Sequence, residues 1–334
     1  MVGAGITGLA AALELSDRGA DVRVFEAARP GAGQSAGVTR LFRHSHADPA
    51  MVRLAVESRS LWDRWSERFG RPLVGPEGVV VTGPEVDAHA VRLRDAGAPC
   101  RLLDGVAEEL PALAAASAGP ALFDERGGPI DVRAAIDALA GALSGSIVPG
   151  RVFRLEPRER SVRVESSEGI VEVGRAIVCA GAEVRELLPD TRVSVGCHLR
   201  GTFRARNELR GRSLACLQDQ SGAHGETAYG APVPGEDLYA VGLSGAYNEV
   251  PEDPSAREPG RNATIADLER RLRAYVGRAL PGLDPEPAAL RLCLTTILPA
   301  GPDNLELRRE GPLTTVLGDN LFKFAPLLGR MLAD

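Results

Sequence analysis

Three glycines at the start of the chain have the spacing of a phosphate-binding turn. Gly3, Gly5 and Gly8 form G-x-G-x-x-G, a helical pattern follows, and the next strand-like segment closes on Glu26. The glycines let the backbone approach a pyrophosphate, the helix N-terminus supplies partial positive charge, and the acid accepts from a ribose hydroxyl. The pattern predicts an adenine dinucleotide site and leaves NAD and FAD open.

A second chemical signal is the only lysine of the chain, Lys323, since every other strongly basic residue is arginine. Phe322, Phe324 and Pro326 surround it with apolar side chains, which predicts burial. A buried ammonium needs a partner, and a compact point charge fits a pocket that a planar guanidinium would overfill. The alternative is an ordinary surface lysine.

Basic residues also follow a Gly/Ser-rich loop that contains Ser35. Arg40 and Arg43 lie three residues apart, and His44 comes next. Two such arginines can pair with phosphates or with a substrate carboxylate through bidentate geometry. The alternative that composition favours is a solvated turn.

Composition excludes several classes of protein. The chain has 334 residues, 44% hydrophobic, with a formal net charge of −6, which argues against nucleic-acid binding through a basic surface. No apolar run approaches the roughly 18 residues of a membrane helix, and the start lacks the basic region of a signal peptide. The five cysteines show no metal-binding spacing, so we expect no metal site and reduced thiols in the cytoplasm.

Four segments together resemble one family of flavoenzymes. The stretch Thr39-Arg40-Leu41-Phe42-Arg43-His44 is similar to a T-R-hydrophobic-hydrophobic-R-H segment of the monomeric sarcosine oxidase group, within the D-amino-acid-oxidase-like enzymes. Residues 175–188, 291–304 and 320–332 match later segments of that group in the same order. The resemblance spans the chain.

The resemblance implies an FAD cofactor and a set of site residues. It implies a covalent bond between Cys293 and the flavin, a clamp of Arg43 and Lys323 on a substrate carboxylate, and Tyr229 lining the pocket, although a core tyrosine is the alternative there. The residues expected at the cofactor are Gly3, Gly5, Gly8, Glu26, Ser35, Thr39, Arg40, His44, Ala180, Gly181, Cys293, Asp319, Leu321, Phe322 and Lys323.

Two departures from the family's pattern bear on the chemistry. The family's lysine that promotes the reaction of reduced flavin with oxygen aligns near Ala240, so the expected acceptor is O₂ or another electron acceptor. Asp319 stands in a run that contains a histidine in the family. The carboxylate there either orients a cationic amine or forms an Asx turn with Asn320.

The expected fold class is α/β, with a Rossmann-type FAD-binding domain interleaved with an α+β substrate domain on an antiparallel sheet. We assign residues 1–80, 130–192 and 290–334 to the FAD-binding domain, and residues 81–129 and 193–289 to the substrate domain. The polar residues 248–262 are expected to form a surface loop before a helix.

The cofactor and the clamp together predict oxidation of a small amine that bears a carboxylate. A hydride would pass from the carbon beside the nitrogen to flavin N5 and leave an imine. N-alkyl amino acids, cyclic amino acids and biosynthetic intermediates remain open as substrates. Two alternatives also remain: an FAD-dependent monooxygenase that uses NAD(P)H, and a non-catalytic flavoprotein subunit.

Overall fold

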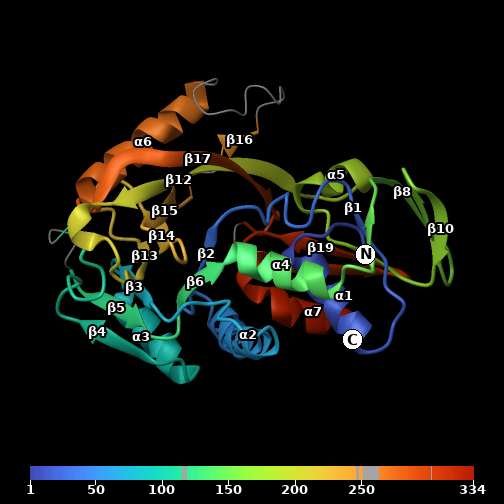
Figure 1. Cartoon of the computed structure of the whole chain (residues 1–334), viewed down its shortest axis with the longest axis horizontal. Helices are drawn as coiled ribbons and strands as arrows, with labels where there is room; N and C mark the ends of the chain where they lie inside the picture. Colours follow the sequence, from blue (N-terminus) through green and yellow to red (C-terminus); the bar gives the residue numbers. More distant parts are fainter. Residues whose placement is uncertain (115–118, 246–247, 251–262, 302) are drawn as a thin grey trace. The chain divides into compact units, whose positions relative to one another are not determined.

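The computed structural model describes residues 1–114, 119–245, 248–250, 263–301 and 303–334 (Figure 1). These residues form two compact units. The first unit consists of Met1–Gly37, Val132–Gly196 and Leu294–Asp334, and the second of Val38–Asp131 and Cys197–Cys293. The chain therefore passes from one unit to the other four times. Within the described ranges, no helix is long and apolar enough to cross a membrane.

A mainly parallel sheet forms the centre of the first unit. Its strands are β1 (Val24–Glu26), β7 (Ile147–Pro149), β11 (Ala176–Val178), β18 (Leu305–Glu310) and β19 (Leu313–Gly318). β1 pairs in parallel with β7, β11 pairs in parallel with β19, and β18 runs antiparallel to β19. Val2 forms parallel bridges with both Phe25 of β1 and Val178 of β11, so this single residue joins the β1–β7 pair to the β11–β19–β18 strands of the sheet. The glycine turn begins directly after it.

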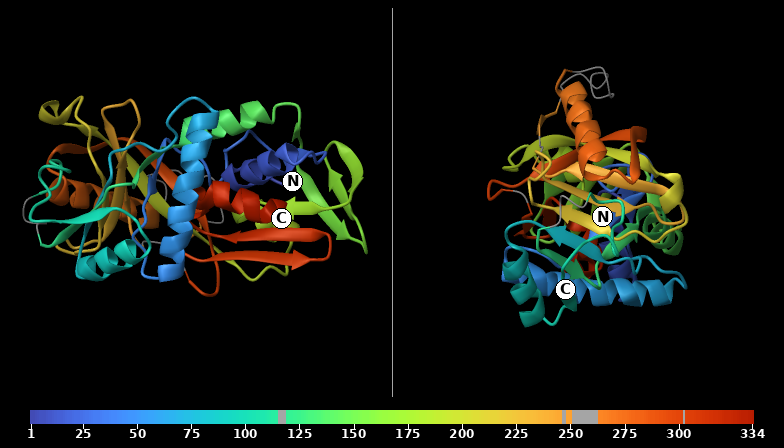
Figure 2. Two further views of the ribbon diagram at one scale, coloured as in Figure 1. Left: turned by 90° about the horizontal axis from the view of Figure 1, so that it is seen from below. Right: turned by 90° about the vertical axis from the view of Figure 1, so that its left-hand side faces the viewer.

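The helices of the first unit are α1 (Ile6–Asp17), α4 (Val132–Ala142) and α7 (Ala325–Ala333). α1 is rich in alanine and leucine, which are strong helix formers, and Gly19 follows its end with a φ of 81°. α1 and α7 pack side by side (Figure 2). They approach closely because Gly329 has no side chain: a Cβ there would lie 2.8 Å from the carbonyl oxygen of Ala10.

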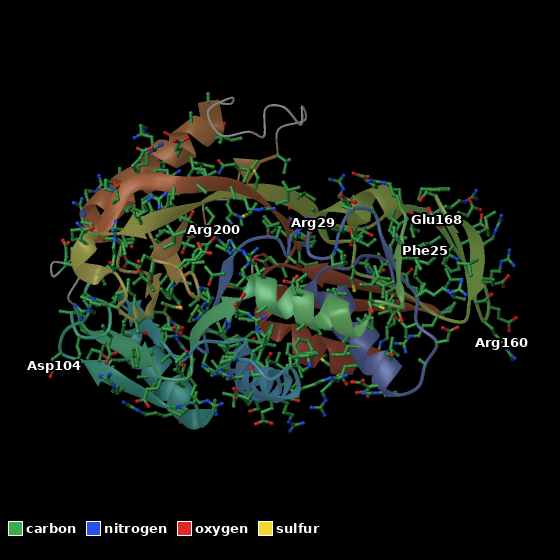
Figure 3. The ribbon with its side chains drawn as sticks, in the orientation of Figure 1. Phe25, Arg29, Asp104, Arg160, Glu168 and Arg200 are labelled. Atoms are coloured by element: carbon green, nitrogen blue, oxygen red, sulfur yellow. The ribbon has the colours of Figure 1, made fainter. Side chains whose placement is uncertain are left out.

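A small antiparallel sheet completes the first unit. It consists of β8 (Val152–Pro157), β9 (Val162–Ser166) and β10 (Gly169–Val173), and the short helices η2 (Gly181–Glu183) and α5 (Val184–Leu187) follow β11. Arg160 and Glu168 lie in its two hairpin turns (Figure 3). Val162 and Val164 of β9 pack into the same apolar cluster as Val178, which anchors the small sheet to the parallel one.

The second unit is built on a nine-stranded sheet. Its strands are β3 (Val79–Thr82), β4 (Cys100–Leu103), β5 (Ala121–Asp124), β12 (Ser194–Ala205), β13 (Cys216–Asp219), β14 (Ala228–Pro232), β15 (Leu238–Leu243), β16 (Asn248–Glu249) and β17 (Leu283–Ile297). The strand order is β16-β12-β15-β14-β13-β3-β5-β4, and β17 also pairs with β12. The β13–β3 pair is parallel, whereas the β3–β5, β12–β15 and β14–β15 pairs are antiparallel. A mainly antiparallel sheet agrees with the expected fold class.

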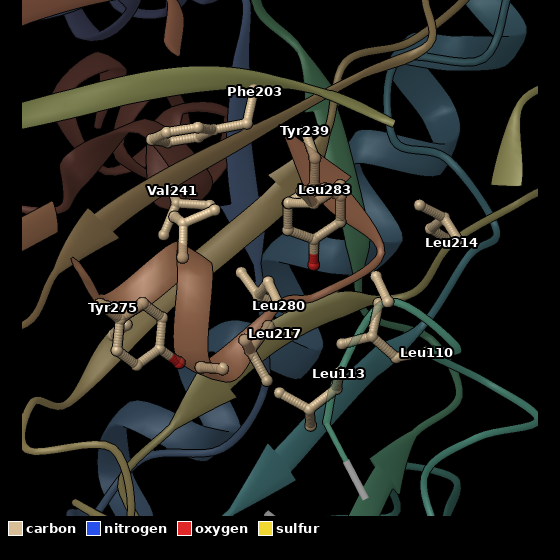
Figure 4. Close-up of a cluster of buried hydrophobic side chains, with 14 of the residues drawn as sticks. Leu110, Leu113, Phe203, Leu214, Leu217, Tyr239, Val241, Tyr275, Leu280 and Leu283 are labelled. Atoms are coloured by element: carbon tan, nitrogen blue, oxygen red, sulfur yellow. The ribbon is translucent and has the colours of Figure 1, made fainter. Parts of the chain in front are cut away.

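A large apolar core lies between this sheet and α6 (Ala263–Ala279), and a second apolar cluster joins the sheet to α2 (Pro49–Arg68) and α3 (Val86–Asp95). Figure 4 shows part of the large core, including Tyr239 of β15 and Tyr275 of α6. Both phenol groups are buried and bonded: Tyr239 donates to the carbonyl oxygen of Ala215 at 2.8 Å, and Tyr275 donates to Asp219 Oδ2 at 2.7 Å. The polar ends of these rings are thus satisfied inside the core.

The remaining elements of the second unit are β2 (Thr39–Phe42), α2 (Pro49–Arg68), α3 (Val86–Asp95), β6 (Gly128–Asp131) and the short η3 (Asn207–Leu209). Asp48 caps α2 by accepting from the backbone N–H of Ala50 at 2.8 Å. The buried face of α2 comprises Val52, Ala55, Ser58, Leu61, Trp62 and Trp65. Leu54 and Val56 of the same helix are only half-buried.

The compact units differ from the expected domain boundaries at residues 38–80, which belong to the second unit. The physical reason is strand pairing: β2 pairs with β6, and β3 lies between β13 and β5. The role of each unit as an FAD-binding or substrate domain stays a prediction. Most of the loop expected at 248–262 lies outside the described residues, and α6 begins at the expected place.

Candidate active site

The glycine turn of the first unit has a geometry that requires glycine at two positions. Gly3 has a φ of 97°, and a Cβ there would lie 2.6 Å from the carbonyl oxygen of Cys179. A Cβ on Gly8 would lie 2.0 Å from the carbonyl oxygen of Gly3. Each distance is shorter than a real contact allows, so the turn closes only without these side chains. This is the close approach that the motif predicts.

Gly5 caps the N-terminus of α1 without a side-chain hydrogen bond. Ser35 approaches this end, since its Oγ accepts from the backbone N–H of Ile6 at 2.9 Å. First-turn amides of a helix have no partner within the helix, and they attract an anion. The backbone amides of the turn and of this helix end therefore suit a pyrophosphate.

Glu26 lies at the end of β1, beside the glycine turn. Its Oε2 accepts from the backbone N–H of Ala4 at 2.7 Å, and its Oε1 accepts from Ala28 at 2.9 Å. These bonds fix the carboxylate next to the turn, where the dinucleotide pattern expects an acceptor for a ribose hydroxyl.

Ala180 and Gly181 follow β11 and meet a second loop of the same unit. Gly181 has a φ of 57°, and a Cβ there would lie 2.5 Å from Gln34 Oε1. The amide of Gln34 donates to the carbonyl oxygen of Leu294 at 3.4 Å and accepts from Thr296 at 3.3 Å. Gln34 thus ties three segments together, a role that its position in a Gly/Ser loop did not indicate.

Lys323 lies in the short helix η5 (Leu321–Phe324), after β19. Its side chain is 5% exposed, and its Nζ lies 5.1 Å from the centre of the Phe324 ring. Phe322 and Phe324 are also buried. The burial expected from the apolar neighbours is confirmed, whereas the contact with a substrate carboxylate stays a prediction.

Asp319 is a second buried charged residue of this segment. Among the residues that the structure describes, its Oδ1 has no hydrogen-bond partner, and Asn320 donates to its Oδ2 at 3.4 Å. Burial, with the neighbouring Asp303 carboxylate, raises the pKa of Asp319 to about 6. Asn320 takes the left-handed conformation, with a φ of 53°. These contacts favour the turn over the amine-orienting alternative.

The basic segment of the second unit holds His44 in a structural pair. His44 Nδ1 lies 2.9 Å from Asp124 Oδ1, and the backbone N–H of His44 donates to Asp124 Oδ2 at 2.7 Å. Both side chains are buried. Asp124 lies 80 positions away in the sequence, and no signal in the sequence identified it as the partner.

Arg43 is half-buried and donates to the carbonyl oxygen of Ser45. It belongs to the second unit, whereas Lys323 belongs to the first. The clamp that these two residues would form therefore stays a prediction.

Tyr229 of β14 contacts an arginine that sequence reasoning missed. Arg200 of β12 donates to the Tyr229 hydroxyl at 3.1 Å, and its guanidinium carbon lies 5.2 Å from the centre of the ring. Arg200 and Arg40 both donate to the carbonyl oxygen of Thr39. The alternation of strand β12 places Arg200 and His198 on one face, which was the available signal.

Cys293 lies in β17 and is half-buried, with its Sγ 3.9 Å from the carbonyl oxygen of Arg291. It is the last residue of the second unit. Ala240, which aligns with the family's oxygen-activating lysine, is buried in β15 and pairs with Thr202 and Ala231. Within the described ranges, no group of three or more His, Cys, Asp or Glu side chains has the arrangement of a metal site.

Comparison with known proteins identifies the family. The family described as "DAO: FAD dependent oxidoreductase" matches residues 1–334. This chain belongs to that family. The resemblance to its sarcosine-oxidase-like branch is confirmed, and the protein is an FAD-dependent oxidoreductase. The glycine turn, the N-terminus of α1 and Glu26 fit the adenine dinucleotide part of FAD.

The curated relatives include oxidases of amino acids. The chain is 28% identical to monomeric sarcosine oxidase of Streptomyces avermitilis, over 100% of this chain and 92% of the relative. It is 25% identical to N-methyl-L-tryptophan oxidase of Salmonella dublin, over 100% and 93%.

Solved structures share the fold. NikD, an amino acid oxidase of nikkomycin biosynthesis, superposes with a TM-score of 0.83 at 22% identity, over 100% of this chain and 92% of NikD. L-proline dehydrogenase from P. horikoshii gives a TM-score of 0.81 at 19% identity, over 99% and 91%. At such identities the likeness establishes the fold alone.

Proposed function

We propose that this DAO-family protein oxidises the C–N bond of a small amine that carries a carboxylate. The observation that carries the proposal is the burial of Lys323, the only lysine, in the segment that follows β19. A buried ammonium is stabilised by a paired anion. The names of two relatives support the proposal, because sarcosine and N-methyl-L-tryptophan are both amines with a carboxylate.

In the proposed reaction, Lys323 and Arg43 hold the carboxylate and thereby orient the adjacent C–H bond. Bound FAD supplies a two-electron hydride acceptor. The substrate nitrogen gives its lone pair to the new C=N bond as the hydride leaves the carbon, and water then hydrolyses the imine to a carbonyl compound and an amine. Tyr229 would line the site. Fixed cations lower the barrier by positioning the reacting bond rather than by exchanging protons.

We further propose that Cys293 carries the flavin covalently, and that the reduced flavin either reacts slowly with O₂ or passes its electrons to another acceptor. The half-buried free thiol of Cys293 supports the first proposal. The second rests on Ala240, a buried methyl group where the family has a cation that stabilises developing superoxide. All five cysteines are free, which supports a reducing compartment such as the cytoplasm.

The first test follows the flavin. The protein is precipitated with acid, and flavin retained on the peptide that contains Cys293 would establish the covalent bond. The holoenzyme is then mixed anaerobically with N-methyl amino acids, and loss of the flavin absorbance is measured. Lys323→Met should weaken the apparent affinity by roughly 10- to 100-fold, the value of a charge-assisted hydrogen bond. Lys323→Arg keeps the charge but should also weaken binding, because the planar guanidinium is too large for a site that holds a buried ammonium.

Three outcomes would contradict the proposed function. Unchanged affinity in Lys323→Met would exclude the clamp. Bleaching by NADPH without an amine would identify a monooxygenase instead. A flavin that no amine and no nicotinamide reduces would identify a non-catalytic flavoprotein.

A further inference from the structure

Two buried side chains from other strands of the second unit hold the residues that follow Arg43. Asp124, at the end of β5, accepts from the backbone N–H of His44 at 2.7 Å. Gln218 of β13 accepts from Ser45 Oγ at 2.7 Å. These bonds join positions that are 80 and 173 residues apart in the sequence. The segment is therefore fixed by the sheet of the second unit and not by its own turn alone.

The bond between the Ser45 hydroxyl and the Gln218 amide lies inside the protein. Ser45 is fully buried, and Gln218 is 8% exposed. Two apolar side chains of similar shape would be about as stable at this depth as a hydrogen-bonded polar pair. Stability alone therefore does not account for the pair, and what the bond positions becomes the question.

The same serine accepts a hydrogen bond from Arg43. Nη1 of the Arg43 guanidinium donates to the backbone carbonyl oxygen of Ser45. A guanidinium carries five N–H donors in one rigid plane, so one fixed hydrogen bond restricts the direction in which the others point. Gln218 holds the hydroxyl of Ser45, and the carbonyl oxygen of Ser45 holds Arg43. Gln218 thus acts on Arg43 through Ser45.

His89 of α3 supports the segment from a third element. It is 8% exposed, it forms a hydrogen bond with the backbone of His46, and its Nδ1 lies 3.3 Å from Arg92 Nη2. Burial, and then the positive charges of Arg92 and Arg43, lower the pKa of His89, so the imidazole is neutral at physiological pH. His89 therefore holds the segment without adding a charge beside Arg43.

We propose that Gln218 and Ser45 are positioning residues for the reaction, because together they hold the Arg43 guanidinium in the plane in which it binds the substrate carboxylate. This inference rests on the proposed function only in that Arg43 binds the carboxylate, and all three residues belong to the second unit. A guanidinium whose plane is fixed before binding loses less entropy when the ligand arrives. It also places the reacting C–H bond more accurately.

The test measures how strongly the protein prefers a carboxylate to a neutral ligand of the same size. Butanoate and butanamide share a carbon skeleton and differ in charge, and neither is an amine. Isothermal titration calorimetry of the holoenzyme gives both dissociation constants, and their ratio is the charge preference. Ser45→Ala and Gln218→Met should each lower this preference by roughly 2- to 10-fold, the value of one net hydrogen bond. The affinity for butanamide should stay unchanged.

A double-mutant cycle and a control variant distinguish positioning from a loss of stability. The variant with both substitutions should lose no more preference than either single variant, because both substitutions break the same hydrogen bond. Tyr239→Phe removes another buried hydrogen bond, to the carbonyl oxygen of Ala215, from the same sheet. It should lower the midpoint of thermal unfolding and leave the charge preference unchanged.

Arg43→Gln, measured in the same way, separates this inference from the proposed function. A preference that falls in Arg43→Gln but not in Ser45→Ala or Gln218→Met would overturn the positioning role and leave Arg43 as the carboxylate ligand. A preference that is unchanged in Arg43→Gln would overturn both. Additive losses in the double variant, or an equal loss in Tyr239→Phe, would show general destabilisation and would also overturn the positioning role.

Discussion

Two buried charged side chains, Asp319 and Lys323, lie four positions apart in the first unit, and their burial has different causes. Lys323 is enclosed by phenylalanines, which the neighbouring sequence indicated. Asp319 is enclosed because Gly318, with a φ of 135°, turns the chain against Asn304, where a Cβ would lie 2.2 Å from the carbonyl oxygen. The chain keeps a carboxyl group at this place although burial makes its ionised form costly.

This cost predicts a pH dependence of stability that Asp319→Asn removes. The pKa of Asp319 is about 6 in the folded protein and 3.8 ordinarily, so the folded state binds the proton more tightly. Stability should fall as the pH rises from about 4 to 6 and then level off. At about 1.4 kcal/mol per pKa unit, the variant should gain roughly 3 kcal/mol relative to wild type between pH 4 and 7.

Denaturant unfolding of both proteins across this pH range measures the difference in the free energy of unfolding. Asp104→Asn, at an exposed position, controls for the loss of one surface charge. A difference between Asp319→Asn and wild type that stays constant with pH would show that the Asp319 carboxyl is not responsible.

At the scale of elements, the buried carboxylate of Asp124 connects the end of strand β5, the turn at Gly127 and the imidazole ring of His44. Asp124 ends β5, accepts from the backbone and the ring of His44 beyond the end of β2, and accepts from the backbone N–H of Gly127 at 3.0 Å. The pair therefore fixes the segment that carries Arg40 and Arg43. The cofactor contact expected for His44 stays a prediction, and its visible contacts are structural.

Asp124→Ala should lower the free energy of unfolding by about 2 kcal/mol or more, because it leaves the buried donors of His44 and Gly127 without an acceptor. Asp63→Ala is the matched control. Asp63 pairs with Arg59 and Arg126 at a side chain that is 37% exposed, and a surface pair of this kind contributes at most about 1 kcal/mol. Equal losses in the two variants would contradict a special role for the buried pair.

The elements that could be predicted from the sequence are those that depend on residues close to one another in the chain. The glycine turn, α1 and β1 follow one another along the chain, so spacing alone indicated them. The contacts that escaped prediction join distant residues: His44 with Asp124, and Thr39 with Arg200, 161 positions apart. Residues 38–80 belong to the second compact unit for the same reason, because β2 and β3 pair with strands far along the chain. Alternation along a strand indicates which residues share a face, not what that face meets.

For the whole molecule, folding depends on the fact that the chain passes four times between its two compact units. The first unit needs residues from the beginning, the middle and the end of the sequence. Its dinucleotide turn lies at residues 3–8, but the helix that packs against α1 is α7, which ends one residue before the C-terminus. The fold of the N-terminal motif therefore depends on residues 325–333, which lie far along the sequence from it.

A chain that ends at Gly318 should consequently fail to fold, although it keeps the complete glycine motif. It lacks α7, which buries Leu327, Leu328 and Leu332. At roughly 1.5–3 kcal/mol for each buried leucine, the loss is about 5–9 kcal/mol, comparable with the whole stability of a typical domain. Circular dichroism and flavin content measure the result, and a chain that ends at Ala333 is the control, since it loses only Asp334 and its ion pair with Arg18. If the shorter chain were to fold cooperatively and retain flavin, the N-terminal motif and its strands would form a stable unit without α7, and the interleaving would not be what couples the two ends of the sequence.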